Sequence, residues 1–232
     1  MTVRIAQAGL NEWGGTHGGE AGNQLRTKGK LDGELNIREW YSKPWEYIIR
    51  PKDPKKAEII ANTAYNCVRN ANIGYDQSQR QTLYWEMKGN GWDASKVKPC
   101  ETDCSSLWCV CANAAGIPID PVVYTGTIVQ FAKDSGQFDI ITENANNPLY
   151  VKKGDCLLKP YDHCVIVLDN GGGDYVATYD LWIRESPLDG KTLKVIPAGT
   201  VVQSIPYPWV RVTYDGVTGW SSLKYLKSLN GD

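Results

Sequence analysis

The chain has 232 residues, of which 42% are hydrophobic and 22% are charged, a composition that is typical of globular proteins and excludes a disordered or fibrous one. Its 25 Lys and Arg residues nearly balance 26 Asp and Glu residues, so no positive excess favours non-specific binding to nucleic acid or to an anionic membrane. No apolar run approaches the roughly 20 residues that cross a bilayer, and the first residues lack the apolar segment of a secretion signal, so we expect a cytosolic protein without membrane insertion.

The first predicted element is a loop-rich arm. Residues 1–30 are rich in Gly and polar side chains and show no sustained period. Two apolar runs follow, ELNIREWY and WEYIIR, and they predict two short strands or a strand and its return. Residues 53–71 then carry apolar side chains at helical spacing behind a capping Asp53, which predicts an amphipathic helix.

A second helix is predicted to begin at Thr102 or Asp103 and to end at Gly116, which places Cys104 in its first turn. A third, shorter helix is predicted over residues 127–133. The runs FDII, CLL and HCVIVL then predict strands that are separated by polar turns. Helices that precede strands in this way indicate the α+β class.

Three consecutive glycines at residues 171–173 form a natural domain linker. Beyond them the chain contains only short β-rich runs, at the spacing of a small barrel or sandwich, with a tight hairpin at Asp215-Gly216. We therefore predict two domains, residues 1–171 and residues 172–232.

Cysteine and histidine are the residues that could carry chemistry. The chain has seven Cys and two His, His17 and His163, which excludes a three-histidine zinc site. At a helix N-terminus, the helix dipole favours a Cys104 thiolate, and free backbone N–H groups could hold an oxyanion. His163 opens a strand after a polar turn, and a Cys/His pair is the minimum for thiol catalysis. The alternative is a Cys that packs as a small apolar residue and a His with a structural hydrogen bond.

The other cysteines favour packing over metal binding. Cys100 and Cys104 are four residues apart and Cys109 and Cys111 are two apart, but no CxxC pair occurs and these spacings match no common zinc module. The remaining three cysteines lie within apolar helix or strand patterns and are predicted to pack in the core: Cys67, Cys156 and Cys164. We expect no zinc site and no cofactor, and a dependence on calcium stays open, although the sequence has no EF-hand-like acidic loop.

The stretch ETDCSSLWCVCANAAGI resembles the nucleophile motif of NlpC-type and CHAP-type cysteine peptidoglycan hydrolases, and KKGDCLLKPYDHCVIVLDNG is similar to their His motif. Residues 20–171 resemble the catalytic domains of Firmicute phage and prophage endolysins, in the pieces AGNQ, IREWYSKPW, NIGYDQSQRQTLY and CETDCSS. The C-terminal runs LWIRESP and VTGWSSLKYL resemble a bacterial SH3-like cell-wall-binding domain. The resemblance implies a papain-like catalytic domain, with helices packed on an antiparallel sheet, followed by a small all-β SH3-like barrel.

The same resemblance implies roles for individual residues. Cys104 would be the nucleophile and His163 the general base, and Tyr75 would assist the oxyanion site or, alternatively, anchor a loop. The usual polar residue on the strand after the His strand is missing, because a glycine-rich stretch stands there. Four residues are candidates to orient the imidazole instead, and Glu34 is favoured among them: Asn170, Asp174, Gln24 and Glu34. His17 matches no motif and is predicted to lie on the surface.

The resemblance implies an endolysin that cuts an amide in the peptide part of Gram-positive peptidoglycan. Such an enzyme would wait in the host cytoplasm until lysis and then act at the cell wall. An N-acetylmuramoyl-L-alanine amidase and an endopeptidase use the same Cys/His machinery, so the bond stays open. Two alternatives are a non-catalytic cell-wall-binding protein and a cysteine protease or transferase that acts on other amides.

Overall fold

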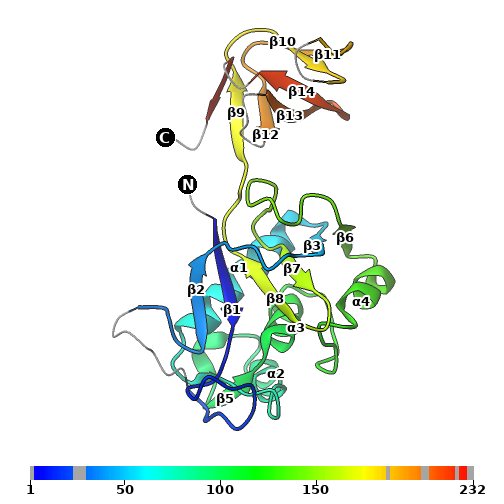
Figure 1. Ribbon diagram of the computed structural model, residues 1–232. Helices are drawn as coiled ribbons and strands as arrows, with labels where there is room; N and C mark the ends of the chain where they lie inside the picture. The colour runs from blue at the N-terminus through cyan, green and yellow to red at the C-terminus, as the bar shows by residue number, and fades with distance from the viewer. Residues whose placement is uncertain (1–2, 23–29, 187–188, 205–208, 223–224, 229–232) are drawn as a thin grey trace. The chain divides into compact units, whose positions relative to one another are not determined.

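The computed structural model describes residues 3–22, 30–186, 189–204, 209–222 and 225–228. The chain divides into two compact units, Met1–Asp169 and Asn170–Asp232. Each unit has its own apolar core, and among the described residues all α-helices lie in the first unit (Figure 1). The combination of helices with largely antiparallel sheets agrees with the predicted α+β class.

The first unit is built on a six-stranded sheet with the strand order β2-β1-β8-β7-β3-β6, in which every neighbouring pair is antiparallel. The strands are β1 (Arg4–Ala8), β2 (Leu35–Glu39), β3 (Tyr47–Pro51), β6 (Phe138–Ile141), β7 (Cys156–Lys159) and β8 (His163–Val167). A separate parallel pair consists of β4 (Ile73–Tyr75) and β5 (Cys100–Thr102). The strand β5 leads directly into the helix that begins at Cys104.

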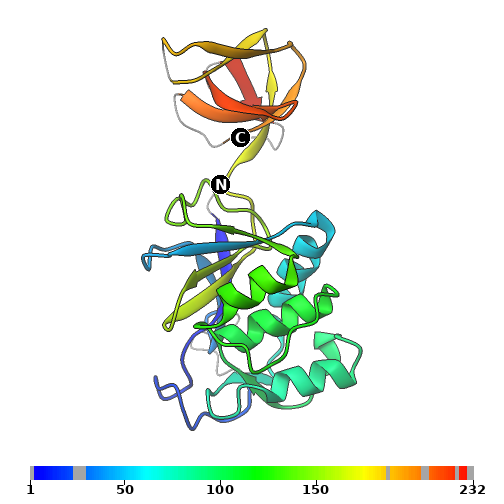
Figure 2. The ribbon, with the colours of Figure 1, turned by 90° about the vertical axis from the view of Figure 1, so that its right-hand side faces the viewer.

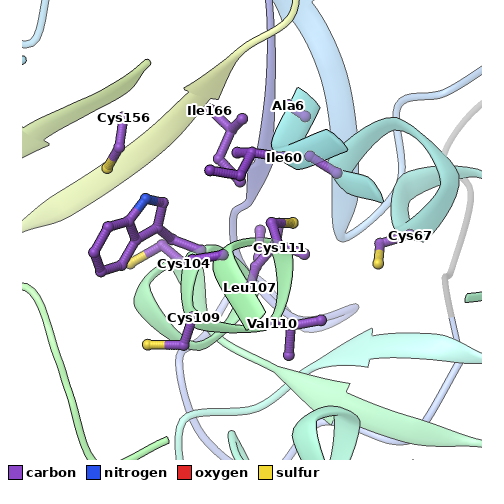
Figure 3. Close-up of a cluster of buried hydrophobic side chains, with 14 of the residues drawn as sticks. Ala6, Ile60, Cys67, Cys104, Leu107, Cys109, Val110, Cys111, Cys156 and Ile166 are labelled. Carbon is purple, nitrogen blue, oxygen red and sulfur yellow. The ribbon is translucent and has the colours of Figure 1, made fainter. Parts of the chain in front are cut away.

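The helices gather on one side of this sheet (Figure 2). They are α1 (Pro54–Arg69), α2 (Thr82–Gly89), the short 3₁₀ helix η1 (Ala94–Lys96), α3 (Cys104–Ala114) and α4 (Ile128–Ser135). Helices α1 and α3 contact each other and also β1 and β8. Figure 3 shows Ile60 of α1 beside Ile166 of the sheet, with both residues on the same side of α3, and Cys156, Ile60 and Ile166 are all buried. The predicted packing role of Cys67, Cys156 and Cys164 agrees with their burial in this core.

The three predicted helices are confirmed as α1, α3 and α4. Asp53 caps α1 as expected, because its side chain accepts the backbone N–H of Lys55 at 2.8 Å. Helix α2 was not predicted, because it is only eight residues long and its buried side chains, Leu83, Tyr84 and Met87, are too few to establish a helical period.

The prediction of a loop-rich arm over residues 1–30 is wrong at its start. Residues Arg4–Ala8 form β1, which lies inside the sheet between β2 and β8. Its Ala6 and Ala8 face the helix-side core, whereas Ile5 packs in a second cluster on the opposite face. Both faces of this strand are covered, so it lacks the polar alternation that marks a half-exposed strand. The run predicted as a strand at residues 34–41 contains β2, and the run at 45–50 overlaps β3, which extends to Pro51; these two strands are not neighbours in the sheet.

The second unit consists of one seven-stranded antiparallel sheet with the order β11-β10-β14-β13-β12-β9-β15. The strands are β9 (Gly173–Ala177), β10 (Leu181–Arg184), β11 (Thr192–Ile196), β12 (Val201–Ser204), β13 (Trp209–Tyr214), β14 (Val217–Ser222) and β15 (Leu226–Ser228). The predicted hairpin is confirmed, because Tyr214 pairs with Val217 and both turn residues have positive φ. Within the part of the chain that the structure describes, no helix is long and apolar enough to cross a membrane.

Candidate active site

The N-terminus of α3 positions Cys104. The Asp103 side chain caps this helix, because its Oδ1 accepts the backbone N–H of Ser106 at 2.7 Å and the Ser105 hydroxyl at 2.9 Å. The whole first turn is buried, and Cys104 is only 7% exposed. The sulfur therefore lies at the positive end of the helix dipole and close to the sheet.

Arg80 fixes this turn from the outside. Its Nε lies 2.7 Å from Asp103 Oδ2, in an ion pair that is largely shielded from solvent. Its Nη2 donates to Ser105 Oγ at 2.9 Å and to the carbonyl of Val123 at 2.6 Å. One guanidinium thus joins the helix cap to the loop that follows α3.

The structure brings Cys104 and His163 together. Hydrogen bonding with the neighbouring Cys164 thiol and burial raise the pKa of Cys104 well above its ordinary value, whereas the hydrogen bond and charge of His163 lower it. The raising effects prevail, so the resting thiol is protonated. The arrangement requires a base to remove this proton when the sulfur attacks a substrate, and the His163 imidazole is in position to do so.

A buried amide orients the imidazole. Gln7 Oε1 lies 3.2 Å from His163 Nε2, and it also accepts the hydroxyl of Tyr41 at 2.9 Å. The Gln7 Nε2 group donates to Asn36 Oδ1 at 3.1 Å, and Asn36 Nδ2 donates to the carbonyl of Gly33. Because Asn36 Nδ2 donates to a carbonyl, Asn36 Oδ1 faces Gln7 and accepts from its amide nitrogen. The Gln7 oxygen is therefore the atom that faces the imidazole. The His163 Nε2 then carries a proton, and Nδ1 is the basic nitrogen.

Gln7 can reach His163 because β1 and β8 are adjacent and antiparallel. Strand alternation places Gln7 on the same face as Ile5, and His163 on the same face as Val165. On this face the Trp45 ring lies 6.3 Å from the imidazole, centroid to centroid. Cys104 belongs to the core on the helix side of the sheet. The site therefore lies at the end of the sheet where β8 begins, because there His163 can contact residues from both sides.

Gln7 was not predicted as a site residue, because the composition of residues 1–30 indicates a loop. The available signal was weak: a single polar residue flanked by Ile5, Ala6 and Ala8, all of which are buried. Its partner strand β8 lies about 160 residues further along the chain, and no local pattern reports that pairing.

Glu34, which was predicted to orient His163, and Tyr75, which was predicted to assist the oxyanion site, contact each other. The Glu34 Oε2 atom accepts the backbone N–H of Tyr75 at 2.6 Å, and both residues are buried. The Tyr75 hydroxyl accepts the side-chain amide of Gln77 at 3.1 Å. Burial, followed by the proximity of Cys104, raises the pKa of this phenol, so it stays a neutral proton donor near the sulfur.

The remaining candidates fall outside the described part of the first unit, except for His17. Asn170 and Asp174 belong to the second unit, and Gln24 lies outside the described residues. His17 is exposed, as predicted, and its Nδ1 lies 2.8 Å from the Thr16 hydroxyl. Among the described residues, no group of three or more His, Cys, Asp or Glu side chains is placed to hold a metal ion.

The comparisons with known proteins give one match. A family model described as an endolysin-like domain matches residues 5–174, a range that contains Gln7, Glu34, Tyr75, Cys104 and His163. No curated protein and no solved structure matches the chain.

Proposed function

Because the chain belongs to the endolysin-like domain family, we propose that it hydrolyses an amide bond in the peptide part of bacterial peptidoglycan by a Cys104/His163 thiol mechanism. Membership of this family indicates a cell-wall lytic function and peptidoglycan as the substrate. The thiol mechanism rests on one observation above all. A buried cysteine at a helix N-terminus contacts an imidazole whose other nitrogen is bonded to a buried amide.

In the proposed mechanism, His163 Nδ1 removes the Cys104 proton as the sulfur attacks the carbonyl carbon of the amide. The tetrahedral intermediate carries its negative charge on oxygen, and the N-terminus of α3 and the neutral Tyr75 hydroxyl are the nearby groups that favour it. The imidazolium then gives its proton to the leaving nitrogen, which departs as an amine. A thioester between Cys104 and the acyl fragment remains.

A water molecule completes the reaction. His163 takes a proton from the water as its oxygen attacks the thioester, and the thiol leaves with a proton as the carboxylic acid product forms. Gln7 accepts the Nε2–H throughout, which holds the ring in plane and stabilises its positive charge while it is protonated. Glu34 contributes indirectly, because its bond to the Tyr75 backbone holds the phenol in place.

We further propose that the second unit is an SH3-like domain that binds the Gram-positive cell wall. Its surface has a groove of about 300 Å³, in which Tyr179, Trp182 and Tyr225 are exposed. The Tyr179 and Tyr225 rings meet edge to face at 5.9 Å, and the Arg184 guanidinium lies 4.7 Å from the centre of the Trp182 ring. The Ser221 hydroxyl in the same groove is buried and has no hydrogen-bond partner among the described residues. Amphipathic rings beside an unused hydroxyl favour a polar ligand with apolar faces.

The test is the loss of turbidity of purified Gram-positive cell walls with the wild type and the Cys104→Ala variant in parallel. Mass spectrometry of the released fragments then identifies the bond. We expect the wild type to clear the walls and Cys104→Ala to bind them without clearing. A stem-peptide terminus released from the sugar would show an amidase, and a cut within the peptide would show an endopeptidase.

The other outcomes separate the alternatives. Equal clearing by both proteins would exclude Cys104 as the nucleophile. Binding of walls by both proteins without clearing, on walls from several species, would support a non-catalytic wall-binding protein. Hydrolysis of soluble protein amides without attachment to walls would support a protease or transferase.

A further inference from the structure

Two exposed tyrosines pair beside the candidate active site. Tyr161, in the turn between β7 and β8, is 79% exposed, and Tyr124, in the loop after α3, is 43% exposed. Their ring centroids lie 6.2 Å apart at an interplanar angle of 63°. Neither hydroxyl has a hydrogen-bond partner in the part of the chain that the structure describes. The pair therefore offers two ring surfaces and two free hydroxyl groups to a ligand.

Two backbone features allow the rings to approach each other: a positive φ at Tyr161 and a glycine at position 126. Tyr161 has a φ of 61°, in the left-handed region that a residue with a bulky side chain rarely adopts. Gly126 lies beneath both rings, and a Cβ at this position would come within 2.5 Å of a Tyr161 ring carbon and 2.7 Å of a Tyr124 ring carbon. Such strain and close approach are found preferentially at functional sites.

Both tyrosines are joined to the groups that position Cys104 and His163. Tyr161 is two residues before His163 in the same turn. Tyr124 follows Val123, whose carbonyl accepts Arg80 Nη2, and Arg80 also pairs with Asp103 at the cap of α3. A ligand on the two rings therefore lies next to elements that carry the sulfur and the imidazole.

The charge beside the ring pair is positive. Asp162, next to Tyr161, pairs with Lys43 at 3.1 Å and with Lys159 at 3.4 Å. One carboxylate thus faces two ammonium groups, each about one third exposed. The excess positive charge favours an anionic ligand group at this edge of the site.

We propose that the Tyr124–Tyr161 pair and the two lysines form a subsite for the acidic stem peptide of peptidoglycan. The rings pack against alanine methyl groups, and Lys43 and Lys159 attract a free carboxylate of the peptide. The sugar chain fits less well, because the carboxyl group of its muramic acid is consumed in the amide to the peptide and leaves no anion for the lysines. This inference rests on the proposed function for its substrate.

The test measures binding to the Cys104→Ala protein, which holds a ligand without cutting it. The probe is an N-acetylmuramoyl tetrapeptide with free carboxylates, titrated by calorimetry. We expect Tyr161→Asn to weaken binding about tenfold, and asparagine suits this position because it tolerates positive φ. Tyr124→Ala serves as a second variant, and Trp85→Ala is the matched control, since Trp85 is a 55% exposed ring on α2 outside this cluster.

The charge is tested by the same probe with its carboxylates converted to carboxamides. This probe should bind several times more weakly than the acidic one, and the difference should disappear in a Lys43→Gln/Lys159→Gln variant. In the otherwise wild-type enzyme, Tyr161→Asn should raise KM about tenfold and leave kcat within about twofold.

Unchanged binding in Tyr161→Asn and Tyr124→Ala, with thermal unfolding that shows both variants folded, would overturn the subsite. Equal affinity for a peptide-free glycan oligomer would overturn the choice of peptide. Failure of the proposed function looks different: the wild type would then leave walls intact, while the Cys104→Ala protein would still bind the acidic peptide through Tyr161.

Discussion

The candidate catalytic residues of the first unit and the aromatic groove of the second unit differ sharply in exposure to solvent. In the first unit Cys104 and Gln7 are each only 7% exposed, and each is held by neighbours from another element. In the second unit Tyr179 is 66% exposed and Trp182 is 55% exposed. Proton transfer requires fixed geometry between a few atoms, which burial and hydrogen bonds supply. Attachment to an extended surface requires rings that the surface can reach.

The largest effect is expected from removing the buried amide of Gln7, which tests whether burial and hydrogen bonding hold His163 in place. Gln7→Ala leaves His163 Nε2 without its acceptor, so the imidazole is free to rotate away from the sulfur. We expect kcat on a soluble wall fragment to fall about 100-fold with little change in KM. Steady-state kinetics measures both parameters.

Gln7→Glu is the matched variant, because it keeps an acceptor oxygen for the imidazole and should recover part of the activity. A kcat for Gln7→Ala equal to that of the wild type would show that another group orients His163. Thermal unfolding of both variants separates lost orientation from a general loss of structure.

The second prediction concerns the exposed rings. Trp182→Ala removes the ring that Arg184 covers in the groove, and we expect the Kd for purified walls to rise about tenfold. Turnover of a soluble fragment should not change, because the first unit is intact. Co-sedimentation with walls measures the Kd, and Val201→Ala is the control, since this exposed residue of β12 lies outside the groove. Equal losses in both variants would argue against the groove.

The smallest expected effect concerns the stability of the first unit and its dependence on the ionisation of buried Glu101. Burial, then the nearby carboxylates of Asp76 and Glu12, raise the pKa of Glu101 to about 7. The folded state thus favours protonated Glu101, and stability falls as pH rises from the ordinary pKa near 4.5 through about 7.

Glu101→Gln mimics the protonated carboxyl at every pH. Its melting temperature should match that of the wild type near pH 4 and exceed it at pH 8. Calorimetry at the two pH values measures the difference. The assignment fails if both proteins lose stability equally between them.

The parts of the site that the sequence predicted are those encoded by local signals. Asp103 and the apolar spacing behind it predicted that α3 begins near Cys104, and α3 does begin there. The resemblance to thiol hydrolases selected His163, which the structure brings to Cys104. Their catalytic roles, and that of Tyr75, stay predictions.

The parts that the sequence could not predict depend on contacts between distant segments. Glu34 was favoured as the partner of His163 because its strand was expected beside β8, but β1 occupies that place and supplies Gln7. The expected strand position was wrong, because the place of a short strand in a sheet depends on tertiary pairing rather than on its own residues. A catalytic role for Glu34 stays a prediction. The same limit concealed the Tyr124–Tyr161 contact, which joins two separate loops.

The place of β1 also determines when the site can exist during synthesis. Gln7 is translated early, whereas its partner strand β8 emerges about 160 residues later, and Ala6 pairs with Ile166 only then. A ribosome-bound chain that ends after β7 contains Cys104 and Gln7 but lacks His163. Closing so long a loop is slow compared with forming the local helices. The candidate site therefore assembles last, after nearly all of the first unit has been synthesised.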